Sequence, residues 1–233
     1  MRAGGMCFSV EADLVAGVAL LPVGVAALRE VRHLREVPFA ALPLLFSMHQ
    51  FVEVLVWLGN DGGVSSCVQS TATSAYVLFA LPVLPTLVPL AVLLLEPRGS
   101  RLRVAPFVVL GLVVSAYLSV AVLDGPIDVD VRAHAIVYGV DLNHGIWWAI
   151  LYVLAVIGPS ILSGYPSIVA FGVVNLVGLS VVATLYVSAF ASLWCVFAAC
   201  SSLLVLVHMR RRRRLPDAHR LHGHPLLPSD ATV

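Results

Sequence analysis

The fold is decided by the stretch RHLREVPFAALPLLFSMHQFVEVLVWL, residues 32–58, in which an arginine-bearing segment leads directly into a long apolar run. The run Phe39–Leu58 is long enough to cross about 30 Å of hydrocarbon as an α-helix. In lipid, every backbone amide must be satisfied within its own segment, so a spanning run must be helical. The stretch therefore predicts a membrane-spanning helix with a basic end.

Six further apolar runs of comparable length occur along the chain. Of its 233 residues, 60% are hydrophobic and 12% charged, which is well outside the composition of soluble globular domains. The predicted spans are Ala12–Leu28, Phe39–Leu58, Ala75–Leu95, Val104–Leu123, Gly145–Leu162, Ile168–Val187 and Ala191–Val207. We therefore expect an all-α integral membrane bundle of seven transmembrane helices over residues 1–208, in a multi-pass protein of the cell membrane.

Arginines are concentrated at one end of these helices. The chain has 14 basic residues, all arginine, and all except Arg2 and Arg132 lie in the segments 29–35, 98–103 and 210–220. An odd number of spans puts these three segments on the same side of the bilayer. Because basic residues are enriched in cytoplasmic loops, we expect the N-terminus outside and the C-terminus in the cytoplasm.

The last part of the chain, residues 209–233, is polar, contains prolines and lacks hydrophobic periodicity. This composition predicts a disordered basic cytoplasmic tail. Its arginine run could attract anionic headgroups, and the simpler interpretation is an anchor that stops translocation. The net charge is only +1, so nothing indicates a nucleic-acid partner, and the expected partner is the lipid bilayer.

The second run carries the polar residues His49, Gln50 and Glu53 in apolar surroundings. His49 and Glu53 are four residues apart and share one face of the helix. An ionisable group at this depth is costly unless it is paired or faces a wet cavity. Two hypotheses follow: a functional polar pocket in the outer half of the bundle, or a buried His–Glu hydrogen bond that only stabilises helix packing.

Other candidate site residues are predicted at the same depth. Asp13 lies at the outer end of the first run and Cys195 in the outer part of the last. The segment RAHAIVYGVDLNHGIWW, residues 132–148, would place four polar side chains on one arc if it were helical. These side chains are His134, Tyr138, Asp141 and His144. Imidazole and carboxylate groups suit zinc or a similar divalent metal. The predicted metal ligands are His49, Glu53, Asp13 and His144, and the predicted catalytic residues are Glu53 and Cys195.

The cysteine and lysine content narrows the range of possible functions further. Cys7, Cys67 and Cys195 are predicted near the outer face, where a Cys7–Cys67 or a Cys7–Cys195 disulfide could form. The chain has no lysine, so it cannot form the Schiff base of a retinal pigment, the best-known class of seven-span proteins.

The stretch from Met6 to Trp57, which begins MCFSVEADLV and includes SMHQFVEVLVW, resembles an uncharacterised family of bacterial multi-pass membrane proteins. Members of that family start with a Met-Cys-Phe-Ser motif and carry a His/Gln-Gln…Glu…Trp pattern in the second span. The later motifs ILSGYPSIVAFG and LWCVFAACSS look like the same family, so the resemblance covers most of the chain. It implies a membrane architecture but no activity. The family start falls at Met6, and removal of that methionine would leave Cys7 as an N-terminal thiol.

Three functional hypotheses follow from these residues. The first is a metal-assisted membrane hydrolase acting on a lipid or other amphiphile, similar in architecture only to the seven-span hydrolases related to ceramidases. The second is a proton-coupled small-molecule transporter or a ligand-binding membrane sensor, in which His49 and Glu53 relay protons or bind the ligand. The third is a structural membrane protein in which the pair only fixes helix packing.

Overall fold

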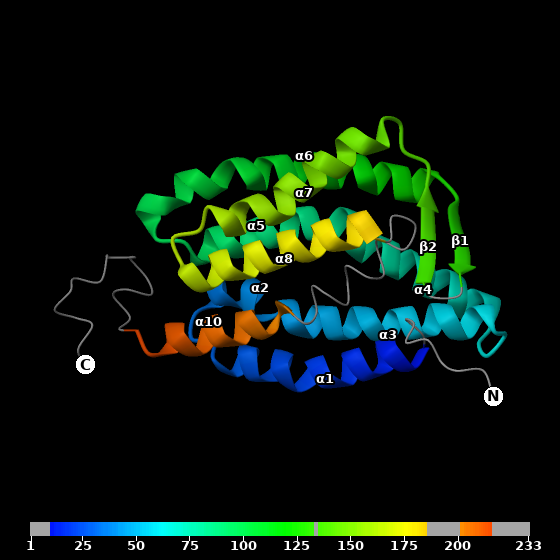
Figure 1. Cartoon of the computed structure of the whole chain (residues 1–233), viewed down its shortest axis with the longest axis horizontal. Helices are drawn as coiled ribbons and strands as arrows, with labels where there is room; N and C mark the ends of the chain where they lie inside the picture. The colour runs from blue at the N-terminus through cyan, green and yellow to red at the C-terminus, as the bar shows by residue number, and fades with distance from the viewer. Residues whose placement is uncertain (1–9, 133–134, 186–200, 216–233) are drawn as a thin grey trace.

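The computed structural model describes residues 10–132, 135–185 and 201–215, and most of these are helical. Figure 1 shows an elongated bundle of lengthwise helices with a β-hairpin near one end. Its main helices are α1 Val10–Arg29, α3 Leu42–Asn60, α4 Ser66–Leu78, α5 Leu84–Leu95, α6 Arg101–Asp124, α7 Gly145–Ile161, α8 Pro166–Leu185 and α10 Leu203–Arg213. Short elements join them: η1 Leu34–Glu36, α2 Val37–Ala40, the π-helical turn η2 Phe79–Val83, and η3 Arg98–Ser100.

Four helical segments are long and apolar enough to cross a membrane: α1, α3, the continuous segment Ser66–Leu95 and α6. Two shorter apolar helices are Gly145–Ile161 and Pro166–Val181. Each of the first six predicted spans overlaps one of these segments over most of its length, which confirms a predominantly helical protein with candidate membrane spans. Most of the seventh, Ala191–Val207, lies outside the described residues.

Small residues on α1 bring it close to α3. Ser47 Oγ donates a hydrogen bond to the carbonyl of Gly17 at 2.7 Å. A Cβ atom at Gly24 would lie 2.6 Å from the backbone nitrogen of Leu44, so only glycine permits this approach. Because α3 presents this side to α1, its opposite side, which carries His49 and Glu53, faces the rest of the bundle.

The third candidate span is irregular where its prolines lie. Pro82 is inside the π-helical turn, and Pro85 is the second residue of α5. Proline lacks a backbone N–H, so a carbonyl one turn earlier loses its donor. The Tyr152 hydroxyl of α7 donates to the carbonyl of Ala80 at 2.6 Å. A side chain from a neighbouring helix thus replaces part of the backbone hydrogen bonding that the prolines remove.

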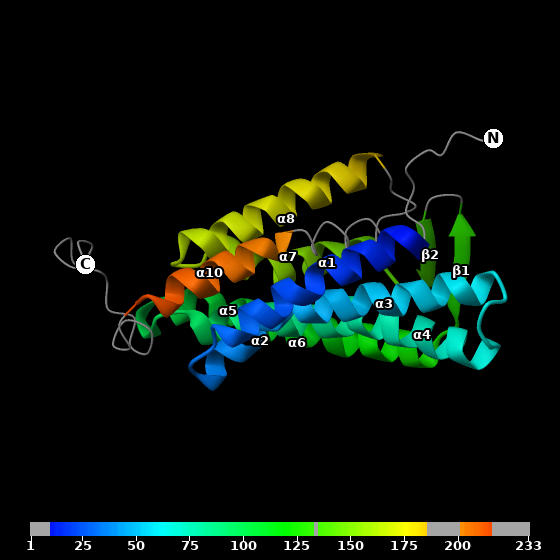
Figure 2. The same ribbon diagram turned by 90° about the horizontal axis from the view of Figure 1, so that it is seen from below.

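The expectation of an all-α protein is wrong in one place, because the segment after α6 forms an antiparallel hairpin of β1 Ile127–Arg132 and β2 Ala135–Val140. In β1 the exposed Asp128 and Asp130 alternate with the half-buried Ile127 and Val129, which is the period of a strand and not of a helix. The hairpin stands at the end of the bundle away from the chain's described C-terminal helix (Figures 1 and 2).

This hairpin also overturns the helical arc predicted for residues 132–148. Tyr138 lies in β2, opposite Val129, and its side chain points toward the bundle. Asp141 and His144 follow the strand at exposed positions, and His144 adopts the left-handed region with φ 60°. His134 lies outside the described residues.

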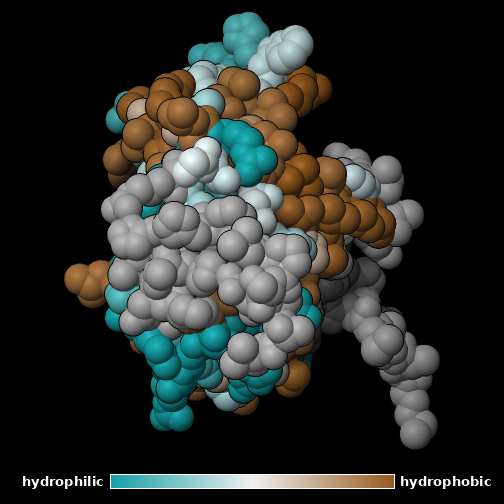
Figure 3. All heavy atoms as spheres, turned by 90° about the vertical axis from the view of Figure 1, so that its left-hand side faces the viewer, coloured by the Kyte–Doolittle hydropathy of each residue, from teal (hydrophilic) through white to brown (hydrophobic). Residues whose placement is uncertain are grey.

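The arginine-bearing segments meet at the other end of the bundle. Arg212 of α10 pairs with Glu36 of η1 at 2.9 Å, and both side chains are buried. The same guanidinium donates to the Tyr165 hydroxyl at 2.9 Å. Burial lowers the pKa of Arg35, and repulsion from Arg212 and Arg101 lowers it further. Figure 3 looks onto this end and shows hydrophilic residues beside the brown, apolar flanks of the helices.

The last described helix runs past the predicted start of the C-terminal tail. α10 continues to Arg213, four residues beyond Met209, where the disordered tail was expected to begin. Arginine is a good helix former, and the buried ion pair of Arg212 fixes this last turn against the start of the chain. A sequence cannot show that pair, because its members are 176 positions apart. Residues 216–233 lie outside the described part.

Candidate functional site

The candidate site is the polar face of α3 that points into the bundle. His49, Gln50 and Glu53 fall within an arc of about 100° on this helix. All three side chains are buried, with Gln50 and Glu53 at 0% exposure. The apolar residues Phe46 and Val56 flank them on the same face and are also buried. The bundle thus encloses His49, Gln50 and Glu53.

Aromatic rings connect this face to the hairpin. The His49 imidazole stacks on the Tyr76 ring of α4, with centroids 4.0 Å apart and planes inclined by 17°. Tyr76 in turn stacks on Tyr138 of β2 at 4.5 Å and 21°. The ring of Phe79 lies 4.8 Å from His49 on another side. His49, Tyr76 and Tyr138 therefore form a column from α3 through α4 to the hairpin, which we call the aromatic column.

Two members of the cluster have polar atoms that make no hydrogen bond to the described residues. Across residues 10–132, 135–185 and 201–215, neither His49 Nε2 nor the two polar atoms of the Gln50 amide make a hydrogen bond. Leaving such a group buried and unsatisfied costs about 1–3 kcal/mol. The amide offers two donors and an acceptor, and a neutral imidazole offers one further donor or acceptor. These atoms can therefore recognise the polar part of a small molecule.

Asp13 is held by a partner of its own. Its Oδ2 accepts a hydrogen bond from the indole Nε1 of Trp57 at 2.9 Å, and both side chains are buried. Trp57 lies one helical turn beyond Glu53 toward the hairpin end. Asp13 thus joins α1 and α3 at their hairpin ends next to the polar face, and its Oδ1 makes no hydrogen bond to the described part of the chain.

The predicted metal ligands do not gather into one group in the described part of the chain, where no three His, Cys, Asp or Glu side chains lie close enough to hold a metal ion. His49 and Glu53 share the polar face, Asp13 binds Trp57, and His144 is exposed at the start of α7. Cys195 lies outside the described residues. The metal-binding and catalytic roles of these residues stay predictions.

Sequence reasoning missed Tyr76, which is 1% exposed and contacts His49 directly. A tyrosine at the start of an apolar run is an ordinary interface residue, so its sequence context gave no sign of stacking. Tyr138 was singled out, but for a helix face and not for a strand. The sequence signal for this strand lies in its partner β1, where polar and apolar residues alternate.

Residues 6–220 match the family model of DUF6629, a family of unknown function. The chain belongs to this family. No curated protein and no solved structure shows significant similarity to it. The DUF6629 match confirms the expectation of an uncharacterised family, and it includes every residue of the polar face and of the aromatic column. These residues therefore belong to the common domain of the family and not to an appended segment.

Proposed function

We propose that this DUF6629 protein is a multi-pass protein of the bacterial cell membrane with seven transmembrane helices, an outer N-terminus and a cytoplasmic C-terminus. Four long and two shorter apolar helices support the membrane location. α8 runs away from the arginine end, and Arg212 of α10 is back at that end in contact with Glu36 (Figure 1). This return of the chain favours an odd number of crossings.

We further propose that the polar face of α3 binds a small polar or amphiphilic molecule. The observation that carries this proposal is the fully buried Gln50 amide, which has no hydrogen-bond partner in the described protein and lies beside an equally unsatisfied His49 Nε2. An apolar side chain at such a position would make the protein more stable. A bound polar group would therefore explain why an amide occupies it. Glu53, one turn away, would supply charge or exchange a proton.

In this account the protein is a ligand-binding membrane sensor or a proton-coupled transporter. The aromatic column of His49, Tyr76 and Tyr138 would form one wall of the site and extend toward the outer hairpin. Ionisable groups inside a membrane bundle commonly mark substrate or proton pathways. His49 and Glu53, one turn apart on a buried face, have the placement that such a pathway needs.

The metal-assisted hydrolase is the second candidate, and the same pair on one helix face favours it. His49, Glu53, Asp13 and His144 would hold a divalent metal, and Glu53 and Cys195 would act in catalysis on a lipid or other amphiphile. A polymer nanodisc cut directly from the membrane keeps the protein with its native ligands. Stoichiometric zinc in such particles, lost in His49→Ala, is the result expected for the hydrolase.

Native mass spectrometry of the full-length protein in these nanodiscs tests the binding proposal. We expect a retained non-protein mass on the wild-type chain, lost in Gln50→Leu. Thr86→Val is the matched control, because Thr86 makes a hydrogen bond to Ser115 between α5 and α6 and lies away from the polar face. A wild-type spectrum of the bare chain, or an adduct kept by Gln50→Leu, would contradict the proposal.

A further inference from the structure

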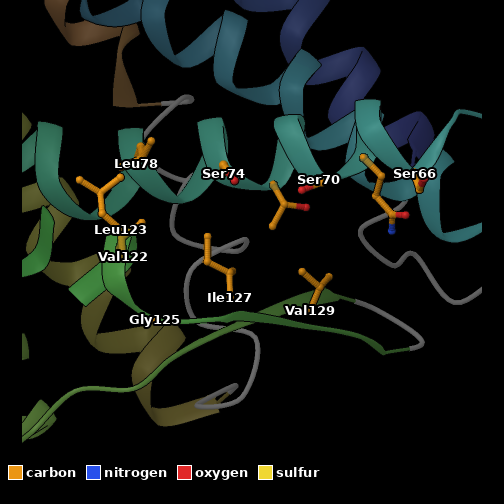
Figure 4. Close-up of a pocket in the computed structure, with 11 residues that line it drawn as sticks. Ser66, Ser70, Ser74, Leu78, Val122, Leu123, Gly125, Ile127 and Val129 are labelled. Carbon is orange, nitrogen blue, oxygen red and sulfur yellow. The ribbon is translucent and has the colours of Figure 1, made fainter. Parts of the chain in front are cut away.

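A second site lies beside the aromatic column, where Val129 of the cavity wall is the cross-strand neighbour of Tyr138. A cavity of about 470 Å³ separates α4 from β1 and the end of α6 (Figure 4). Its volume falls within the range of about 300–1,000 Å³ that is usual for ligand sites. The α4 wall is formed by neutral polar side chains, which are Ser66, Gln69, Ser70, Thr73 and Ser74. The opposite wall is apolar and includes Val122, Ile127 and Val129.

The polar wall follows from the four-residue spacing of Ser66, Ser70 and Ser74, which puts all three on one helical face. A hydroxyl inside a helix often donates to the carbonyl four residues earlier. Thr71, on another face of α4, does so with the carbonyl of Cys67 at 2.8 Å.

The wall hydroxyls behave differently. In the portion of the chain that the structure describes, the side chains of Ser66, Ser70, Ser74 and Thr73 make no hydrogen bond. Thr73 is the most enclosed of these residues at 6% exposure, and it lines the cavity. A ligand in the cavity would meet these hydroxyls as both donors and acceptors.

The chemistry of the walls selects a neutral, hydroxyl-rich ligand. Hydroxyl and amide groups can each donate and accept, so a row of them matches a row of ligand hydroxyls. None of the described residues that line the cavity is charged, so an ionic ligand would lose its hydration without gaining a counter-charge from them. The apolar wall of Val122, Ile127 and Val129 suits the C–H face of a ring. A sugar ring combines a polar rim with such a face.

The depth of the cavity agrees with this chemistry. The continuous segment Ser66–Leu95 has 30 residues, which corresponds to about 45 Å of helix. The hydrocarbon core takes up about 30 Å of that length. With Leu95 at the arginine end of the core, the first ten or so residues stand in the opposite headgroup layer. Ser66, Ser70 and Ser74 therefore lie where the sugar of a lipid headgroup, or a sugar from outside, would meet the protein.

We propose that the cavity between α4 and β1 binds the ring of a neutral sugar, either free or as the headgroup of a glycolipid. The proposal rests on the walls of the cavity and the orientation of the bundle, and not on ligand binding at His49 and Gln50. The two sources differ only in what is attached to the ring, so one set of experiments distinguishes them.

The test uses the full-length protein in phosphatidylcholine nanodiscs. Saturation-transfer NMR with glucose, galactose and mannose measures binding of free sugars. Native mass spectrometry measures binding of the glycolipid headgroup in nanodiscs doped with monoglucosyl diacylglycerol. Nanodiscs doped with phosphatidylglycerol are the anionic comparison. We expect binding of at least one free sugar, of the glycolipid in preference to phosphatidylglycerol, or of both.

The matched variants are Ser70→Ala with Thr73→Val for the wall, and Thr71→Val for the other face of the same helix. Loss of two hydrogen bonds should weaken sugar binding about tenfold, while Thr71→Val should bind as the wild type does. Ser66→Ala, at an exposed position, serves if the double variant folds poorly. Absence of sugar and glycolipid binding, equal retention of phosphatidylglycerol, or equal weakening by Thr71→Val would overturn the proposal.

Discussion

Replacing Gln50 by leucine is expected to stabilise the protein. The Gln50 side chain is fully buried, and its amide makes no hydrogen bond to the described residues, so leucine removes a desolvation cost without breaking a contact. Leucine has a similar volume, which limits cavity or overpacking effects. Relief of the unsatisfied amide should raise the free energy of unfolding by about 1–2 kcal/mol.

Asn175→Leu is the matched control for this change. Asn175 is also buried in a helix, but its amide nitrogen donates to the carbonyl of Phe171 at 2.8 Å and to Ser201 Oγ at 2.9 Å. Its replacement should lower the free energy of unfolding by about 1–3 kcal/mol. Both variants are measured by denaturant titration in detergent, after washing that removes bound small molecules. If Gln50→Leu destabilises the protein as much as Asn175→Leu does, Gln50 has a protein partner and the reasoning fails.

Three further perturbations test the packing and orientation. Arg212→Met removes the buried ion pair with Glu36 and should lower the free energy of unfolding by about 3–5 kcal/mol. Arg213→Met, at a half-exposed pair, should change it by less than about 1 kcal/mol. Equal effects in the same denaturant titration would refute the buried pair. Gly24→Ala places a Cβ against the backbone of α3 and should cost about 1–3 kcal/mol in that titration, and a neutral effect would mean that the two helices do not approach closely. In intact cells, a variant with Cys67 as its sole cysteine should react with a membrane-impermeant maleimide. A Leu34→Cys variant that lacks the native cysteines should react only after permeabilisation. The reverse labelling pattern would show that the protein has the opposite orientation in the membrane.

Much of the helical architecture could be predicted, because length and hydropathy alone determine where a helix can span a membrane. The positions of α1, α3 and α6 follow from this. The hairpin was missed because residues 132–148 were read for helical spacing, although the alternation of Asp128 and Asp130 with apolar neighbours was visible in the residues just before them. The extension of α10 depended on Arg212 meeting Glu36, a long-range contact with no local signal.

The candidate site, like the helices, was predictable in part from local sequence features. His49, Gln50 and Glu53 attract notice because polar side chains are rare in spans, and helical spacing places them on one face. Stacking of His49 on Tyr76 joins two helices, so it required the packing of α3 against α4. The hydroxyl wall of α4 was visible as a four-residue spacing, but its meaning depended on the hairpin that closes the cavity.

The most direct test of the central claim is an electron cryomicroscopy map of the full-length protein in nanodiscs cut from its native membrane. We expect density for a non-protein molecule larger than water within hydrogen-bond distance of the Gln50 amide and of His49 Nε2. Density for apolar side chains alone, for another protein side chain, or for water alone around these atoms would contradict the claim that this face of α3 binds a ligand.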